Sequence, residues 1–159
     1  MDGQQTRETL LASLSERYDA YRAVYSGTAR YNTTNEILSS LIARRADGGN
    51  RGILLDQLRQ EAEELIAALL PLLDAVPEVA DSCALAALEP ILFYPLAKGE
   101  RELSMSLAAL EGIAAPLLPY ISSADLAELL RRYRKRNPPR LMFPNQAALF
   151  RQMQLLAAK

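Results

Sequence analysis

The sequence contains no histidine, and this absence excludes several kinds of chemistry. Without an imidazole there can be no Ser-His or Cys-His nucleophile, no histidine phosphotransfer and no histidine ligand for a metal. Carboxylates remain, but Glu61 and Glu64 share one face of a helix in the stretch QEAEEL, which is typical of a solvated helix surface. We therefore expect no enzyme activity, no catalytic or cofactor-binding residues, no metal site and no cofactor.

Cysteine and long apolar runs are also scarce. The one cysteine, Cys83, permits no internal disulfide, and a lone thiol within SCALAAL is typical of a small buried residue. The longest apolar run, LIAALLPLL at residues 65–73, is far shorter than the ~20 residues that a membrane span needs. The start MDGQQTRETL lacks the basic and apolar stretches of a secretory signal. These features predict a cytoplasmic protein with no membrane span.

Proline is missing from the first 70 residues, and acidic residues are missing from the end of the chain. Because all nine prolines occur from Pro71 onward, we expect long helices first and shorter or kinked helices later. Residues 1–130 hold all 19 acidic and 10 of the 18 basic residues, whereas residues 131–159 hold the other 8 basic residues. The charge pattern therefore predicts an acidic body with a basic C-terminal end.

The first half of the chain carries the apolar spacing of two long helices. Steps of 3 and 4 residues link Leu11, Leu14, Tyr18, Tyr21 and Tyr25 in one segment, and Leu55, Leu58, Ala62, Leu65, Leu69 and Leu72 in another. Matching stripes of this kind predict an antiparallel helical hairpin over residues 1–76. The spacing from Thr33 to Glu36 fits a capping box, so a helix can begin there. Alternatively, the poor helix formers NTTN at residues 32–35 are a weak spot in one continuous helix. The glycine-rich segment 47–52 is predicted to turn the chain.

Residues 77–137 are predicted to form shorter, proline-kinked helices. Pro77 suits a helix start, Pro90 and Pro95 would bend or end that helix, and Gly99 suits a stop. The next apolar stripe contains Leu103, Leu107, Leu110, Ala114 and Leu117. Because no fixed repeat period emerges, we favour a bundle over a helical solenoid. The expected fold class is all-α: one domain over residues 1–159, a helical bundle with a long N-terminal antiparallel hairpin.

The stretch RRYRKRNPPR at residues 131–140 is the most basic part of the chain. Upstream, Ser122 fits an N-cap with Asp125 as its capping-box partner, so a helix begins there and Pro138 ends it. Cations in a last helical turn are favoured by the helix dipole, so a solvated helix end is the simplest interpretation. The alternatives are that Arg131, Arg132 and Arg134 contact an acidic protein surface or nucleic-acid phosphates.

Residues 138–159 combine a short apolar segment with a last helix, for which Asn145 is a candidate cap. The large apolar residues here are Leu141, Met142, Phe143, Phe150 and Met153. They can fold back onto the protein's own core. Alternatively they can dock onto another chain, because Met and Phe on a terminal segment suit helix-in-groove binding.

Tyr18, Tyr21 and Tyr25 lie in the middle of the first apolar stripe, where leucine would be the simple choice. A phenol keeps a polar group at such a position, which suits a partly hydrated interface. These tyrosines can therefore either pack in the protein's own core or line a groove that binds a partner.

The hairpin pattern resembles the general layout of small bacterial export chaperones of the flagellar and type III secretion systems. The resemblance covers at most the first 75 residues and consists of helix pattern, with tyrosines and acidic residues on the hairpin, rather than a motif. It implies a cytoplasmic chaperone that binds other proteins.

Together these features favour a non-enzymatic helical module for protein–protein interaction, such as an adaptor, chaperone or assembly subunit. Its partner is another protein or a second copy in a homodimer. One alternative is a nucleic-acid-associated subunit that uses residues 131–140, and another is an export chaperone. We expect the partner-binding residues to come from the tyrosines of the hairpin, the basic run and the C-terminal apolar side chains.

Overall fold

A computed structural model of the chain describes residues 3–28, 34–96 and 98–159, with side chains described in 3–23, 54–96 and 98–159. No strand occurs in these described ranges, so the prediction of an all-α helical fold is confirmed. In chain order the elements are α1 (Gly3–Thr28), α2 (Thr34–Ala75), α3 (Pro77–Leu92), α4 (Arg101–Ala108), the 3-10 helix η1 (Glu111–Tyr120), α5 (Ser123–Arg136), the short 3-10 turn η2 (Pro139–Leu141) and α6 (Pro144–Ala157).

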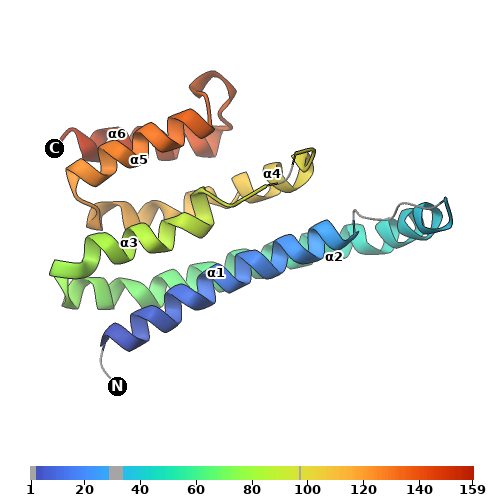
Figure 1. The fold of residues 1–159 in the computed structure, drawn as a ribbon, viewed down its shortest axis with the longest axis horizontal. Helices are drawn as coiled ribbons and strands as arrows, with labels where there is room; N and C mark the ends of the chain where they lie inside the picture. The colour runs from blue at the N-terminus through green and yellow to red at the C-terminus, as the bar shows by residue number, and fades with distance from the viewer. Residues whose placement is uncertain (1–2, 29–33, 97) are drawn as a thin grey trace.

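The long N-terminal hairpin is present and consists of α1 and α2. Arg17 Nε of α1 lies 3.2 Å from Glu61 Oε2 of α2, and Tyr21, one turn further along α1, lies beside Leu54 and Leu58, earlier in α2. The two helices therefore run antiparallel, side by side (Figure 1).

The position of the hairpin turn differs from the prediction. Residues 47–52 lie within α2, which continues unbroken from Thr34 to Ala75. Each glycine inside a helix costs about 1 kcal/mol relative to alanine, a penalty that a long helix can absorb. The link between α1 and α2 falls at residues 29–33, which lie outside the described residues, as does the predicted cap Thr33.

The buried residues of α2 also differ in part from the predicted stripe. Its buried side chains are Leu58, Ala62, Ile66, Leu69 and Leu73, whereas Leu65 and Leu72 are only partly buried. A strict heptad stripe serves a helix with a single partner. Because α2 packs against α1, α3 and η1, a wider face of the helix is covered.

The helices form successive layers (Figure 1). The first layer is α1 with α2, the middle layer is α3 with α4 and η1, and the C-terminal layer is α5 with α6. The middle layer packs against both outer layers, because α3 meets α1 and α2 on one side and η1 meets α6 on the other.

Apolar side chains of the middle layer form the centre of the core. Leu88, Ile91, Leu92, Leu103, Leu107, Leu117 and Leu118 have no exposed surface. Pro77 opens α3, and the predicted stripe from Leu103 to Leu117 is buried, but it lies on two helices, α4 and η1, that meet at a bend of 49°. Pro116 and Pro119 lie within η1, where a 3-10 helix replaces the expected α-helix.

The caps of the last two helices are partly as predicted. Ser122 caps α5 by accepting from the Asp125 backbone N–H at 3.3 Å, which confirms the cap. The Ser122 N–H donates to Asp81 Oδ1 of α3 at 3.1 Å, so the expected reciprocal bond to Asp125 is replaced by a tertiary contact. Asn145 does not cap α6. Its amide donates to the Ala108 carbonyl at 2.6 Å, because α6 begins at Pro144 and its start packs against α4.

Gly99 ends the loop before α4 with a φ of 94°, in a region that favours glycine. We predict that Gly99→Ala lowers the free energy of unfolding by about 1 kcal/mol, because alanine is strained in that conformation. Gly112→Ala is the matched control, since a Cβ there meets nothing within 4 Å and the backbone requires no glycine. Urea unfolding compares the two variants. Equal losses of stability in both would contradict the prediction.

Candidate functional site

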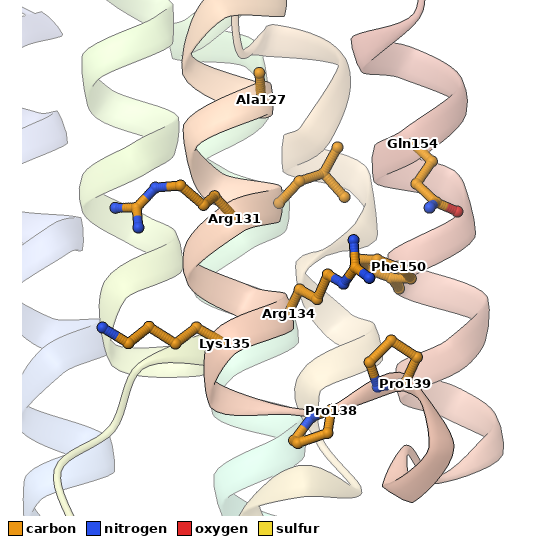
Figure 2. A pocket seen from close by; sticks show the side chains of 9 residues that line it. Ala127, Arg131, Arg134, Lys135, Pro138, Pro139, Phe150 and Gln154 are labelled. Carbon is orange, nitrogen blue, oxygen red and sulfur yellow. The ribbon is translucent and has the colours of Figure 1, made fainter.

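The candidate site is a groove on the outer side of the C-terminal layer, between α5 and α6 (Figure 2). Its volume is about 640 Å³. The lining residues are Ala127, Leu130, Arg131, Arg134, Lys135, Pro138, Pro139, Phe150 and Gln154. We call this the α5–α6 groove. It contains Arg131, Arg134 and Phe150, which the sequence analysis proposed as partner-binding residues from two separate segments.

The floor of the groove is apolar. Leu130 and Phe150 are half-buried and pack against the core, while Ala127 and the two prolines are exposed. The Phe150 ring stacks on Tyr133, with ring centroids 6.4 Å apart and planes 22° from parallel. This stacking fixes the position of the Phe150 ring, because Tyr133 itself has no exposed surface.

Cations line the groove, and no acidic residue is among its lining residues in the described part of the chain. Arg131 donates two hydrogen bonds to Glu128, at 2.6 and 3.0 Å, on the exposed side of α5. Arg134 and Lys135 have no ion-pair partner among the described side chains. In Figure 2, Arg134 extends toward Phe150, whereas Arg131 and Lys135 leave α5 on the side away from α6.

Arg132 has a different role from its neighbours. Its guanidinium donates to both carboxylate oxygens of Glu89 in α3, at 2.8 and 3.3 Å, and lies 4.1 Å from the centre of the Phe93 ring. The hydrogen bond from Arg132 to Glu89 raises the pKa of the arginine. Arg132 therefore joins α5 to the middle layer and does not line the groove.

A second hollow lies beside the short turn between α5 and α6. It encloses about 380 Å³ and shares Pro138 with the α5–α6 groove. Leu141, 66% exposed, and Phe143, 42% exposed, form its apolar rim, and Arg136 supplies a cation. Met142, between them, is half-buried against the core.

A buried carboxylate holds the C-terminal layer onto the middle layer. Glu111, at the start of η1, has no exposed surface and accepts hydrogen bonds from the Tyr133 hydroxyl at 2.6 Å, the Tyr94 hydroxyl at 3.0 Å and the Gln146 amide at 3.1 Å. These four residues, the Glu111 network, join η1, α5, α6 and the segment after α3. These donors reach both oxygens of the carboxylate, so its burial is compensated.

Burial shifts the protonation equilibria of this network. It raises the pKa of the Glu111 carboxyl, against the opposing effect of the hydrogen bonds from Tyr133, Tyr94 and Gln146. Burial, followed by the charge of Glu111, raises the pKa of the Tyr94 and Tyr133 hydroxyls. Both hydroxyls therefore keep their protons and act as donors. Because Glu111 is closed off from solvent, we assign it a structural role.

Several residues proposed from the sequence as partner-binding lie inside the protein. Tyr18 and Met153 have no exposed surface and Tyr21 is 7% exposed, so in this structure all three pack in the protein's own core. Tyr25 lies outside the residues whose side chains are described. Sequence reasoning missed Glu111, Tyr94 and Gln146. A single carboxylate in the otherwise apolar stretch LAALEGIAAPLL was the available signal for Glu111.

The described residues contain no cluster of three or more His, Cys, Asp or Glu side chains that could hold a metal ion. Across the same residues, no single helix has both the length and the apolar character needed to cross a membrane; the bent pair α4 and η1 has them only when taken together. The chain matches no protein-family model, no curated protein and no solved structure in our comparisons. The function is therefore inferred from the site alone.

Two tyrosine-to-phenylalanine variants separate satisfied from unsatisfied buried hydroxyls. The Tyr18 hydroxyl is buried and has no hydrogen-bond partner among the described residues, whereas the Tyr133 hydroxyl donates to Glu111. We predict that Tyr133→Phe lowers the free energy of unfolding by about 1–3 kcal/mol, because it removes a donor from a buried carboxylate. Tyr18→Phe should leave stability unchanged or raise it by about 1 kcal/mol. Urea unfolding of both variants compares their losses of stability. A larger loss for Tyr18→Phe than for Tyr133→Phe would refute the prediction.

Proposed function

We propose that this protein is a non-enzymatic helical interaction module and that its C-terminal layer binds a partner protein in the α5–α6 groove. The observation that carries the proposal is the combination, in one groove, of an apolar floor at Leu130 and Phe150 with two cations, Arg134 and Lys135, that have no ion-pair partner among the described side chains. Apolar surface surrounded by polar groups on an otherwise soluble fold is typical of an interaction site.

The layered architecture supports the same proposal. In stacked helical proteins the outer face of the last layer is usually polar, because no further layer covers it. Here α5 and α6 carry exposed apolar Ala127 and Leu155 together with the exposed cations Arg131, Arg134 and Lys135, and Leu155 is 63% exposed. A partner that covers this face would remove the apolar surface from water, and each 100 Å² of apolar area buried contributes about 2.5 kcal/mol before the costs of association.

Nucleic acid fits the groove less well than protein. Single-stranded nucleic acid needs exposed aromatic rings on which bases can stack. The aromatic ring in this groove, Phe150, is half-buried and already stacks on Tyr133. The first layer is also acidic where its side chains are described, with Glu63 and Glu64 exposed on α2, and would repel a long polyanion.

An affinity pull-down from the source organism tests the proposal. The purified protein should recover a specific protein partner, and the double variant Arg134→Glu/Lys135→Glu should recover about tenfold less, because it reverses the charge of the groove. Arg151→Glu is the matched control, since Arg151 is exposed on α6 but does not line the groove. Circular dichroism should show the same helical content for all three proteins.

Three other results would identify the partner or contradict the assignment. A homodimer by light scattering that dissociates in the double variant would identify the partner as a second copy and support the groove as the interface. Recovery of the same partner by wild type and double variant would contradict the assignment to the groove. Recovery of nucleic acid in place of protein, lost in the double variant, would contradict the proposed partner class.

A further inference from the structure

We infer that the α5–α6 groove takes an acidic amphipathic helix, about three turns long, that lies antiparallel to α5. This inference rests on the proposed function and adds the chemistry, length and direction of the partner segment. It follows from the dimensions of the groove, the arrangement of its cations and the dipole of α5.

The length of the groove sets the length of the occupant. Its lining residues on α5 begin at Ala127, and the groove continues to Pro138, just past the end of that helix. At a rise of 1.5 Å per residue, this separation of about 11 residues corresponds to roughly 16 Å, or three helical turns. A helix of the same length whose axis runs along the groove would cover the whole groove. An extended strand would require a sheet edge for backbone pairing, and the described residues form no sheet.

The cations select an acidic helix with its charges on one flank. Arg131 and Lys135 are one helical turn apart and lie on the side of α5 away from α6, whereas Arg134 extends toward Phe150 (Figure 2). A partner helix above the groove can therefore place one carboxylate beside Lys135 and another, one turn away, beside Arg131, whose guanidinium also donates to Glu128. Its apolar stripe can then rest on Leu130 and Phe150.

The helix dipole determines the direction. Arg134 and Lys135 occupy the last turn of α5, where the helix carries a partial negative charge. An antiparallel partner places its N-terminus, with a partial positive charge, at this end of the groove. Acidic residues in the first turns of the partner then favour its own dipole and also lie opposite Arg134 and Lys135. A parallel partner would need its acidic residues in its last turns, where the dipole disfavours them.

Labelled synthetic peptides of 12 residues, used as probes, test the inference by fluorescence anisotropy. The first peptide carries an apolar stripe with glutamates in its N-terminal half, and the second carries the same stripe with glutamates in its C-terminal half. We expect the first to bind the full chain more tightly than the second. Arg134→Glu/Lys135→Glu should weaken the first peptide about tenfold, equivalent to about 1.4 kcal/mol, and Arg151→Glu should leave it unchanged.

A charge-swapped probe completes the experiment. A peptide with lysines in place of the glutamates should bind the Arg134→Glu/Lys135→Glu variant more tightly than the wild type, because the attraction is restored with the signs reversed. This gain of binding cannot arise from misfolding of the variant.

The outcomes distinguish the inference from the proposed function. Equal affinity for the two glutamate peptides would overturn the direction, and failure of both to bind would overturn the acidic helix as occupant. If a partner protein is nevertheless lost from the double variant in the pull-down, the groove remains a protein-binding site with a different occupant. If duplex DNA binds the groove with the same dependence on Arg134 and Lys135, the choice of a protein helix is overturned.

Discussion

A carboxylate remains in an apolar core only when hydrogen-bond donors surround it, and Glu111 imposes this requirement on the C-terminal half of the protein. Its donors come from Tyr94, Tyr133 and Gln146, so three other segments must approach η1 closely. Removal of one donor leaves a buried acceptor unsatisfied and lowers the free energy of unfolding by the full desolvation penalty of that group. The loss of one apolar contact leaves no polar group unsatisfied. The Glu111 network thus specifies how α5 and α6 sit on the middle layer.

The α5–α6 groove depends on this buried network. Tyr133 donates to Glu111 from the inner face of α5, and its ring supports Phe150, which forms the groove floor. Gln146 donates to Glu111 and accepts from the Phe143 backbone N–H at 3.1 Å, which ties the start of α6 to the same point. The groove is therefore already formed in the single chain. Under the proposed function, such a preformed site would lose less conformational entropy on binding.

The pairing of the two long N-terminal helices and some local features were predictable from the sequence, whereas the contacts between the later helices were not. The Ser122 cap and the Pro77 start depend on neighbouring residues, and the structure contains both. The partners of Glu111 lie 17, 22 and 35 residues away, a relation that no local spacing reveals. For the same reason, Arg131 and Arg132 looked equivalent in sequence, yet one lines the groove and the other pairs with Glu89. The turn expected at residues 47–52 shows that glycine content alone does not end a long helix.

Hydrogen exchange on the Tyr133→Phe variant tests the role of the Glu111 network most directly. If this network holds the C-terminal layer in place, amide exchange in α5 and α6 will accelerate relative to wild type, while exchange in α1 and in residues 54–75 of α2 stays unchanged. Unchanged exchange in α5 and α6, or an equal acceleration in every helix, would contradict that role.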